Sequence, residues 1–184
     1  FLTMFGLTAC SQNNRNDQSA GSGHSNEVAL SNLNLGIQYM QNHEYEKSLE
    51  NLNKALAADP NYTPTYNALG VLYQRIEKNE QAEQYFKKAL SINANDPHTL
   101  NNYGQFLCAT KHYDEAQALF MKAAANPLFD SPEIALTNAG TCAINNNHPD
   151  VAEANFKRAL EKNPRIPAAL IQMAQLSYAN GNYL

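Results

Sequence analysis

Histidines, cysteines and paired carboxylates are the side chains of this sequence suited to metal binding, thiol chemistry or acid–base catalysis. The histidines are His24, His43, His98, His112 and His148. They are scattered, without the His-x3-His spacing on one helix that a zinc site would use. Glu44 and Glu46 lie where a helix is expected to begin, and there the helix macrodipole favours carboxylates without any catalytic role. No G-x4-G-K-[ST] phosphate loop occurs. The sequence therefore predicts no metal, no cofactor, no small-molecule substrate and no enzymatic activity.

Cys10 ends a segment that resembles a bacterial lipobox. Residues 1–7 are apolar and uncharged, like the second half of a signal peptide. Leu7, Thr8 and Ala9 then supply the branched and small residues that precede a lipid-modified cysteine. On this interpretation residues 1–10 are a partial lipoprotein signal peptide, and Cys10 receives a diacylglyceryl thioether. The alternative is a chance cysteine after an apolar N-terminus.

Residues 11–26 are nearly all Ser, Asn, Gln and Gly, with few charges. Such a composition buries too little apolar surface to form a core, so we expect a flexible tether. Its r.m.s. span would be about 20–24 Å. Ser11, rather than Asp, follows the cysteine, as in lipoproteins sorted to the outer membrane of Gram-negative cells. The lipobox and Ser11 thus resemble those of outer-membrane lipoproteins, so we expect a lipid-anchored protein that faces the periplasm.

The rest of the chain repeats with a period near 34 residues. Gly36, Gly70 and Gly104 are spaced by 34 residues, and Gly140 follows 36 residues later. The stretch 66–89 resembles the tetratricopeptide pattern W-x2-L-G-x2-Y…A-x3-F, with Tyr66 in place of Trp. Large residues around each glycine share one face of a first helix, and Ala-x3-Phe lies on a second helix. We therefore expect an all-α superhelix of antiparallel helix pairs.

The array is expected to span residues 27–184. Its repeats are predicted at about 27–60, 61–96, 97–130 and 131–164, with a partial fifth at 165–184. Prolines at or near the repeat ends support these boundaries, since Pro cannot continue a helix interior. The final first helix has no second helix after it, so we expect the natural protein to continue. The two extra residues of the third junction fall in the loop 126–132, where Leu128 and Phe129 are expected to cover the end of the stack or, alternatively, to touch a partner.

Cys108 and Cys142 lie on the predicted first helices of repeats three and four. First helices of successive repeats pack side by side, and an exported protein meets an oxidising compartment. We predict a disulfide between them. The alternative is two small buried cysteines that fill contacts between helices.

The first helices of such an array line a concave groove, where we predict that a partner binds. Leu30, Leu33, Ile37 and Met40 form one apolar stripe on the first helix of repeat one, beside a second stripe with Leu35 and Tyr39. One stripe is expected to pack on the second helix. The other, which we take to be that of Leu33, has no preceding repeat to cover it and should face the groove or solvent. The alternative is that this stripe is capped by the chain's own N-terminal segment or buried.

Further along, the residues predicted to face the groove become mostly polar. They are Asn67, Val71, Asn101, Gln105, Thr137 and Thr141. Their side chains are suited to hydrogen-bond the backbone of an extended peptide.

The lipobox, the polar tether and the tandem repeats together resemble the PilF/PilW pilotin family of type IV pilus lipoproteins, as do the segments 101–107 and 137–142. The resemblance implies a non-enzymatic outer-membrane lipoprotein that binds the secretin subunit and promotes its outer-membrane localisation and multimerisation. It also implies a lipid on Cys10, paired Cys108 and Cys142, and a secretin-binding groove in the first repeats. Support for pilus assembly or stability follows from the same resemblance.

Two other classes stay open. One is another periplasmic tetratricopeptide adaptor lipoprotein, such as a peptidoglycan hydrolase scaffold or an outer-membrane assembly subunit. The other is an accessory or regulatory module of an enzyme. The sequence has no basic stripe that indicates nucleic acid binding, and no stretch of about 18 apolar residues that would span a membrane.

Overall fold

The structure, a computed structural model, describes residues 17–179, with side chains from residue 26 onward. Over this range it contains nine helices and no strand, so the expected all-α fold is confirmed. The helices are α1 (Asp17–Gln41), α2 (Tyr45–Ala58), α3 (Thr63–Arg75), α4 (Asn79–Ile92), α5 (Pro97–Ala109), α6 (Tyr113–Ala124), α7 (Pro132–Asn145), α8 (Pro149–Lys162) and α9 (Pro167–Ala179).

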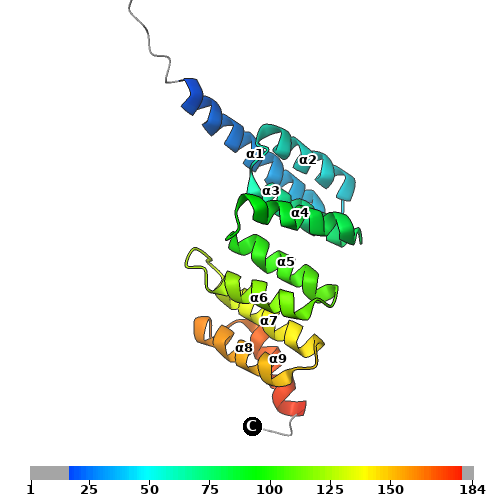
Figure 1. The fold of residues 1–184 in the computed structure, drawn as a ribbon, viewed down its shortest axis with the longest axis vertical. Helices are drawn as coiled ribbons and strands as arrows, with labels where there is room; N and C mark the ends of the chain where they lie inside the picture. Colours follow the sequence, from blue (N-terminus) through cyan, green and yellow to red (C-terminus); the bar gives the residue numbers. More distant parts are fainter. Residues whose placement is uncertain (1–16, 180–184) are drawn as a thin grey trace, which may run out of the picture.

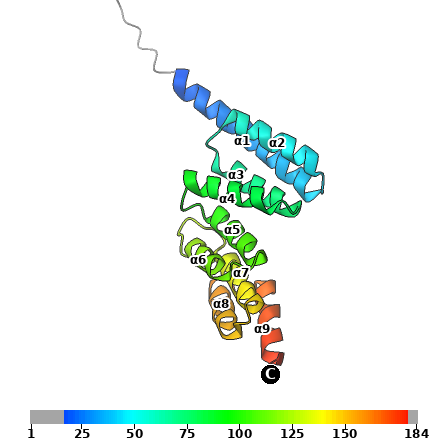
Figure 2. The ribbon, with the colours of Figure 1, turned by 45° about the vertical axis from the view of Figure 1, so that its right-hand side comes forward.

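The helices follow one another along the long axis of the molecule, from α1 at one end to α9 at the other (Figure 1). Each odd-numbered helix up to α7 pairs with the helix that follows it, and α9 packs against α7 and α8. A view turned by 45° shows the same order, with α1 and α2 at one end of the stack and α8 and α9 at the other (Figure 2). The described chain is thus a solenoid of four helix pairs and one further first helix.

The corner between the two helices of a pair is built the same way in every repeat. His43, Glu77, Lys111 and Asn147 adopt left-handed backbone conformations, with φ between 58° and 67°. The residue after each of them donates its N–H to a carbonyl five residues back, as Lys78 does to Tyr73 at 2.9 Å. This is the hydrogen bond of a Schellman cap, which ends the first helix and reverses the chain.

Close approach within a pair depends on the repeated glycine. A β-carbon on Gly70 would lie 2.7 Å from the Cδ1 and Cε1 atoms of Phe86, which is fully buried. In repeat one the equivalent glycine, Gly36, faces Leu52, a smaller side chain than the phenylalanine of the other repeats. There the Ser48 hydroxyl also donates to the Gly36 carbonyl at 2.8 Å. The absent side chain therefore makes room for one large residue of the second helix.

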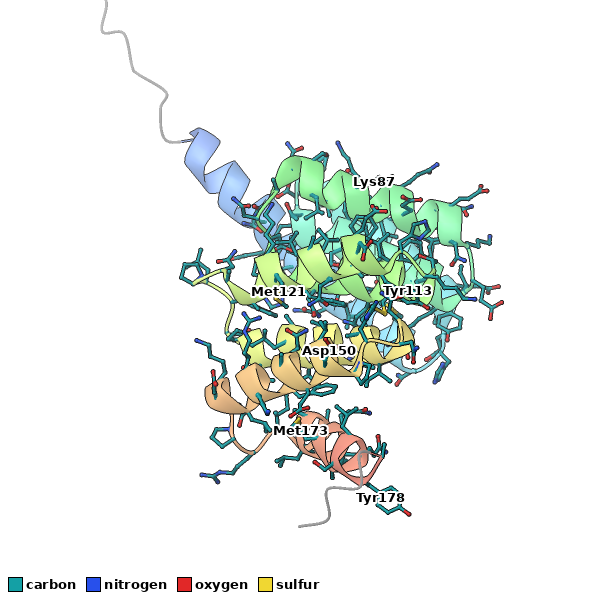
Figure 3. The ribbon with its side chains drawn as sticks, turned by 60° about the horizontal axis from the view of Figure 1, so that its bottom comes forward. Lys87, Tyr113, Met121, Asp150, Met173 and Tyr178 are labelled. Atoms are coloured by element: carbon teal, nitrogen blue, oxygen red, sulfur yellow. A yellow bond between two sulfur atoms is a disulfide. The ribbon has the colours of Figure 1, made fainter. Side chains whose placement is uncertain are left out.

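Apolar clusters join each pair to the next. Phe86 of α4 stacks on Tyr103 of α5, with ring centroids 5.4 Å apart. Met121 of α6 and Met173 of α9 both pack on the cluster that surrounds Phe156, from opposite sides of the α7/α8 pair (Figure 3). Because every cluster spans a junction, the core is continuous along the solenoid.

At its N-terminal end the structure differs from the predicted tether. Helix α1 begins at Asp17 and includes residues 17–26, which the composition assigned to a segment without secondary structure. Its first turns extend beyond the end of α2 (Figures 1 and 2). Adding residues to an existing helix requires no new nucleation, so residues with weak helix propensity can extend the packed part of α1 at its N-terminal end. The predicted signal segment with Cys10, the tether residues 11–16 and residues 180–184 lie outside the described residues.

The two apolar residues of the loop 126–132 differ in burial. Phe129 is buried and meets the His98 ring edge to face, with centroids 5.3 Å apart. Leu128 is 86% exposed. The expectation that the loop covers the stack is therefore confirmed for Phe129 and wrong for Leu128, because only one of two adjacent side chains in this turn points towards α5.

Candidate functional site

A groove runs along the side of the stack formed by the first helices α1, α3 and α5. One part of it is a cavity of about 370 Å³. The lining residues are Leu33, Ile37, Met40, Gln41, Pro64, Asn67, Ala68, Val71, Arg75, Asp96, His98 and Asn102. A second hollow of about 470 Å³ shares Val71, Arg75 and Asn102 with it and adds Gln74 and Gln105. The shared residues make the two hollows one surface, which we call the groove.

The floor of the groove is apolar and belongs to the core. Leu33 and Met40 are 5% and 4% exposed and pack with Leu69 and Leu72 of α3. Ile37 lies between them on α1 and is half-buried. Because the same side chains fill the junction of repeats one and two, the floor is held in place by packing on both sides.

On α1 the stripe with Leu33 lines the groove, as predicted, but it is largely buried rather than uncovered. Leu35, assigned to the helix contact, is 42% exposed, whereas Leu33 and Met40 are buried. Leu69 occupies the position of Leu35 in repeat two and is fully buried against repeat one. In the part of the chain that the structure describes no helix pair packs on this side of repeat one, so Leu35 lacks that cover, while Leu33 and Met40 pack on the repeat that follows. Leu30, at 45% exposure, does not line the groove.

Asparagine side chains form a relay across three first helices. Asn138 of α7 donates its amide N–H to Asn101 Oδ1 at 2.9 Å. Asn101 donates to Asn102 Oδ1 at 3.4 Å, and Asn102 donates to Asn67 Oδ1 at 3.1 Å. The relay crosses from α7 through α5 to α3 and ends at the wall of the cavity, where Asn67 lies.

Six of the predicted groove residues line the groove, namely Leu33, Ile37, Met40, Asn67, Val71 and Gln105. Asn101 does not, because it is only 7% exposed and lies within the relay. Its neighbour Asn102 takes the place in the wall. A step of one period from Asn67 arrives at Asn101, whereas the residue that corresponds to Asn102 in repeat two is Ala68, which also lines the cavity.

Several lining residues were not predicted. Arg75 lies one helical turn after Val71, so continuing the spacing of four along α3 would have found it. Asp96 is the N-cap of α5 and His98 lies in its first turn, and no periodic signal marks them. Gln41, Pro64 and Ala68 also belong to the lining.

The polar groups around the groove are suited to binding. The Asp96 carboxylate is committed to the N-terminus of α5, where it accepts from the backbone N–H of Thr99 at 2.7 Å. Arg75 donates one N–H to the Met40 carbonyl at 3.3 Å and is otherwise exposed. In the part of the chain that the structure describes, no three His, Cys, Asp or Glu side chains gather as metal ligands. None of the described helices is long and apolar enough to cross a membrane.

Cys108 and Cys142 are joined in the structure. Their Cα atoms lie 5.8 Å apart, and the disulfide links α5 to α7 across the junction of repeats three and four. Neither cysteine lines the groove, so the bond constrains how α5 and α7 pack without taking part in the lining.

Comparison with known proteins assigns the repeats. Tetratricopeptide repeat models match residues 27–95, 77–137 and 137–184. The chain is similar to the solved structure of PilF from Pseudomonas aeruginosa, with 29% identity, a TM-score of 0.82, and coverage of 87% of this chain and 72% of PilF. It is 32% identical to PilW, described as a widely conserved type IV pilus biogenesis factor, with a TM-score of 0.78 and coverage of 85% of this chain and 72% of PilW.

The chain is a tetratricopeptide repeat protein of the PilF/PilW type. A solved structure of MamA has the same fold as this chain. The two share 18% identity, with a TM-score of 0.65 and coverage of 85% of this chain and 84% of MamA. No curated protein sequence matches the chain. For this tetratricopeptide repeat protein, the groove over repeats one to three is the surface whose geometry is suited to a protein partner.

Proposed function

We propose that this protein is a non-enzymatic lipoprotein of type IV pilus biogenesis that binds the secretin subunit. In this role it promotes the outer-membrane localisation and multimerisation of the secretin, and it supports pilus assembly or stability. The observation that carries the proposal is the similarity to PilF and PilW over 87% and 85% of the chain. The fold gives independent support, because tetratricopeptide arrays act by holding other proteins rather than by catalysis.

The groove is the proposed secretin-binding surface. An apolar floor flanked by amide and guanidinium groups is the composition typical of a site for a peptide segment, in which the floor provides affinity and the polar wall provides orientation. Ile37 contributes to the floor and is only half-buried, so it is accessible to a partner.

A lipid on Cys10 is the proposed anchor, with the repeats facing the periplasm. The lipobox residues Leu7, Thr8 and Ala9 support this assignment. The Cys108–Cys142 disulfide supports an oxidising compartment. Cys10→Ser should remove radiolabelled palmitate from the protein and release it from outer-membrane fractions. Unchanged membrane fractionation of Cys10→Ser would reject the anchor.

The partner is tested in cells that carry type IV pili. The full-length lipoprotein is crosslinked in intact cells and purified, and the bound proteins are identified by mass spectrometry. We expect the secretin in the wild-type sample and its loss with Ile37→Asp. Val151→Asp, on the exposed side of α8 away from the groove, is the matched control and should retain the secretin.

Leu33 is unsuitable for this experiment because its side chain is buried in the core, and Leu33→Asp would unfold the first repeats. Peptidoglycan hydrolases or outer-membrane assembly factors in place of the secretin would assign the protein to the other class of periplasmic adaptors. That result would overturn the pilus assignment while leaving the fold and the anchor in place.

A further inference from the structure

The loop 126–132, between α6 and α7, holds one apolar side chain out into solvent. The loop projects from the side of the stack (Figure 1). Among the described residues no large apolar side chain is more exposed than that of Leu128, at 86%. A single exposed leucine is common on protein surfaces, so the surroundings of Leu128 decide whether it has a role.

The backbone around Leu128 is anchored on both sides. The Asn126 side-chain amide donates to the Asn95 carbonyl at 2.7 Å, and its oxygen accepts from the Leu128 N–H at 2.9 Å. On the other side Phe129 is buried, and its N–H donates to the Asn126 carbonyl at 3.1 Å. Because this turn is already fixed, contact through Leu128 would order little additional chain.

A hollow of about 380 Å³ lies directly beside this side chain. Its lining residues are Asn95, Leu100, Lys122, Ala125, Asn126, Pro127 and Leu128 itself. Four of these seven are apolar, and none of the seven lines the groove. This surface therefore has a projecting apolar group and an apolar recess side by side.

A projection next to a recess is self-complementary under a twofold rotation. In an isologous dimer both copies use the same patch, so Leu128 of each copy enters the hollow of the other. A bilayer surface would cover Leu128 but leave the recess unfilled. The Asp130 carboxylate, two residues further on, also opposes an anionic lipid surface. The arrangement thus favours a second copy of this chain.

Charge agrees with the twofold arrangement. Lys122 borders the hollow and donates to the Ala94 carbonyl at 2.8 Å. Asp130 is exposed and accepts from the Ser131 hydroxyl at 3.1 Å. Within the described residues neither side chain forms an ion pair. When Leu128 enters the hollow of a second copy, Asp130 moves with it towards the Lys122 of that copy, and the symmetry makes two such pairs.

We infer that this protein forms a twofold-symmetric dimer in which Leu128 of each copy fills the hollow of the other, and Lys122 of each copy pairs with Asp130 of the other. The patch involves far fewer than the roughly 20–30 residues per side of a stable interface, so the dimer exchanges with monomers. The inference goes beyond the proposed function. The crosslinking experiment tests the secretin separately, because Leu128 lies outside the groove.

Sedimentation velocity at increasing concentrations of the full-length protein measures this association. The protein carries Cys10→Ser, so that no lipid contributes. We expect a dimer whose dissociation constant rises about tenfold or more with Leu128→Ser. Val151→Ser, on the exposed side of α8, is the matched control and should change it less than about twofold. A monomer at every concentration, or a dimer that Leu128→Ser leaves unchanged, overturns the inference.

A mixture of two variants tests the exchange of side chains. Ala125 is exposed, so Ala125→Trp should fill the hollow without disturbing the fold and should prevent dimerisation by itself. A mixture of Ala125→Trp and Leu128→Ser proteins recovers one contact, because Leu128 of the first enters the open hollow of the second. We expect the mixture to associate more strongly than either variant alone. A mixture no stronger than its components overturns the twofold exchange.

A charge exchange tests the ion pairs. Lys122→Glu and Asp130→Lys each place like charges together and should weaken the dimer about threefold or more, whereas the double variant restores opposite charges and the affinity. A double variant weaker than both single variants overturns the pairing. Vesicles of phosphatidylethanolamine and phosphatidylglycerol test the alternative occupant. Vesicle binding that Leu128→Ser abolishes, with a monomer in solution, overturns the dimer in favour of a membrane contact.

Discussion

The Asp96 carboxylate accepts two hydrogen bonds from Thr99, one from its backbone N–H at 2.7 Å and one from its hydroxyl at 2.5 Å. In repeat two the corresponding residues are Tyr62 and Thr65, and the buried Thr65 hydroxyl has no hydrogen-bond partner. The two threonines hold the same position in successive repeats. They differ in the residue three positions earlier, because Asp96 accepts the hydroxyl hydrogen bond of Thr99 and Tyr62 accepts none from Thr65.

Thr99→Val should lower the free energy of unfolding by about 1–2 kcal/mol, because it removes a hydroxyl that Asp96 holds. Thr65→Val should leave that free energy unchanged or raise it, since it replaces an unsatisfied buried hydroxyl with a methyl group. Urea unfolding followed by circular dichroism measures both values, and equal losses for the two variants would contradict the assignment of the cap.

Glu77→Gly should stabilise the protein. Glu77 has a φ of 60° at the end of α3, and this left-handed conformation costs an L-residue about 1–2 kcal/mol that glycine avoids. Its negative charge also lies at the unfavourable end of the helix dipole. We expect a gain of about 1 kcal/mol in urea unfolding.

Asn147→Gly is the control for Glu77→Gly. Asn147 has a φ of 58° in repeat four, and asparagine tolerates this region better than glutamate. The gain should be less than half of that for Glu77→Gly. A larger gain from Asn147→Gly would mean that backbone strain does not set the stability of these corners.

Reduction of the Cys108–Cys142 disulfide should lower stability. The bond closes a loop with a sequence separation of 34, which corresponds to about 3–4 kcal/mol of loop entropy in the unfolded chain. The urea midpoint in dithiothreitol should therefore fall relative to that of the oxidised protein. The Cys108→Ala/Cys142→Ala double variant should not respond to the reductant, and an equal response would show that the reductant acts elsewhere.

Tyr103 should make stability sensitive to alkaline pH. Burial raises the pKa of Tyr103 to about 12, and the Glu83 carboxylate, 3.3 Å from its hydroxyl, adds to the effect. The unfolded chain loses this proton near pH 10. The stabilisation is therefore fully present below pH 10, and it is lost as the pH rises towards 12.

Urea unfolding at intervals from pH 9 to 11.5 measures this loss. Tyr103→Phe should flatten the decline but not abolish it, because burial also raises the pKa of Tyr85. A slope that Tyr103→Phe leaves unchanged would assign the pH dependence to other groups.

The sequence by itself determined the fold and its period. The recurrence of Gly70 and of the Ala-x3-Phe segment that includes Phe86 predicted the pairing of helices before any contact was known. Spacing also placed Cys108 and Cys142 on neighbouring first helices, and it found six of the residues that line the groove. These features depend on which residues share a helix face, and helical spacing encodes that directly.

Only the tertiary structure decided which neighbour covers each face. Leu33 and Leu35 lie on two stripes of one helix, and the buried stripe is the one that the following repeat happens to meet. Asn102 rather than Asn101 borders the groove because Asn101 is buried and accepts a hydrogen bond from Asn138. The asparagine relay joins three helices, so its direction and its end at Asn67 depend on their packing, which the spacing within any one helix does not contain.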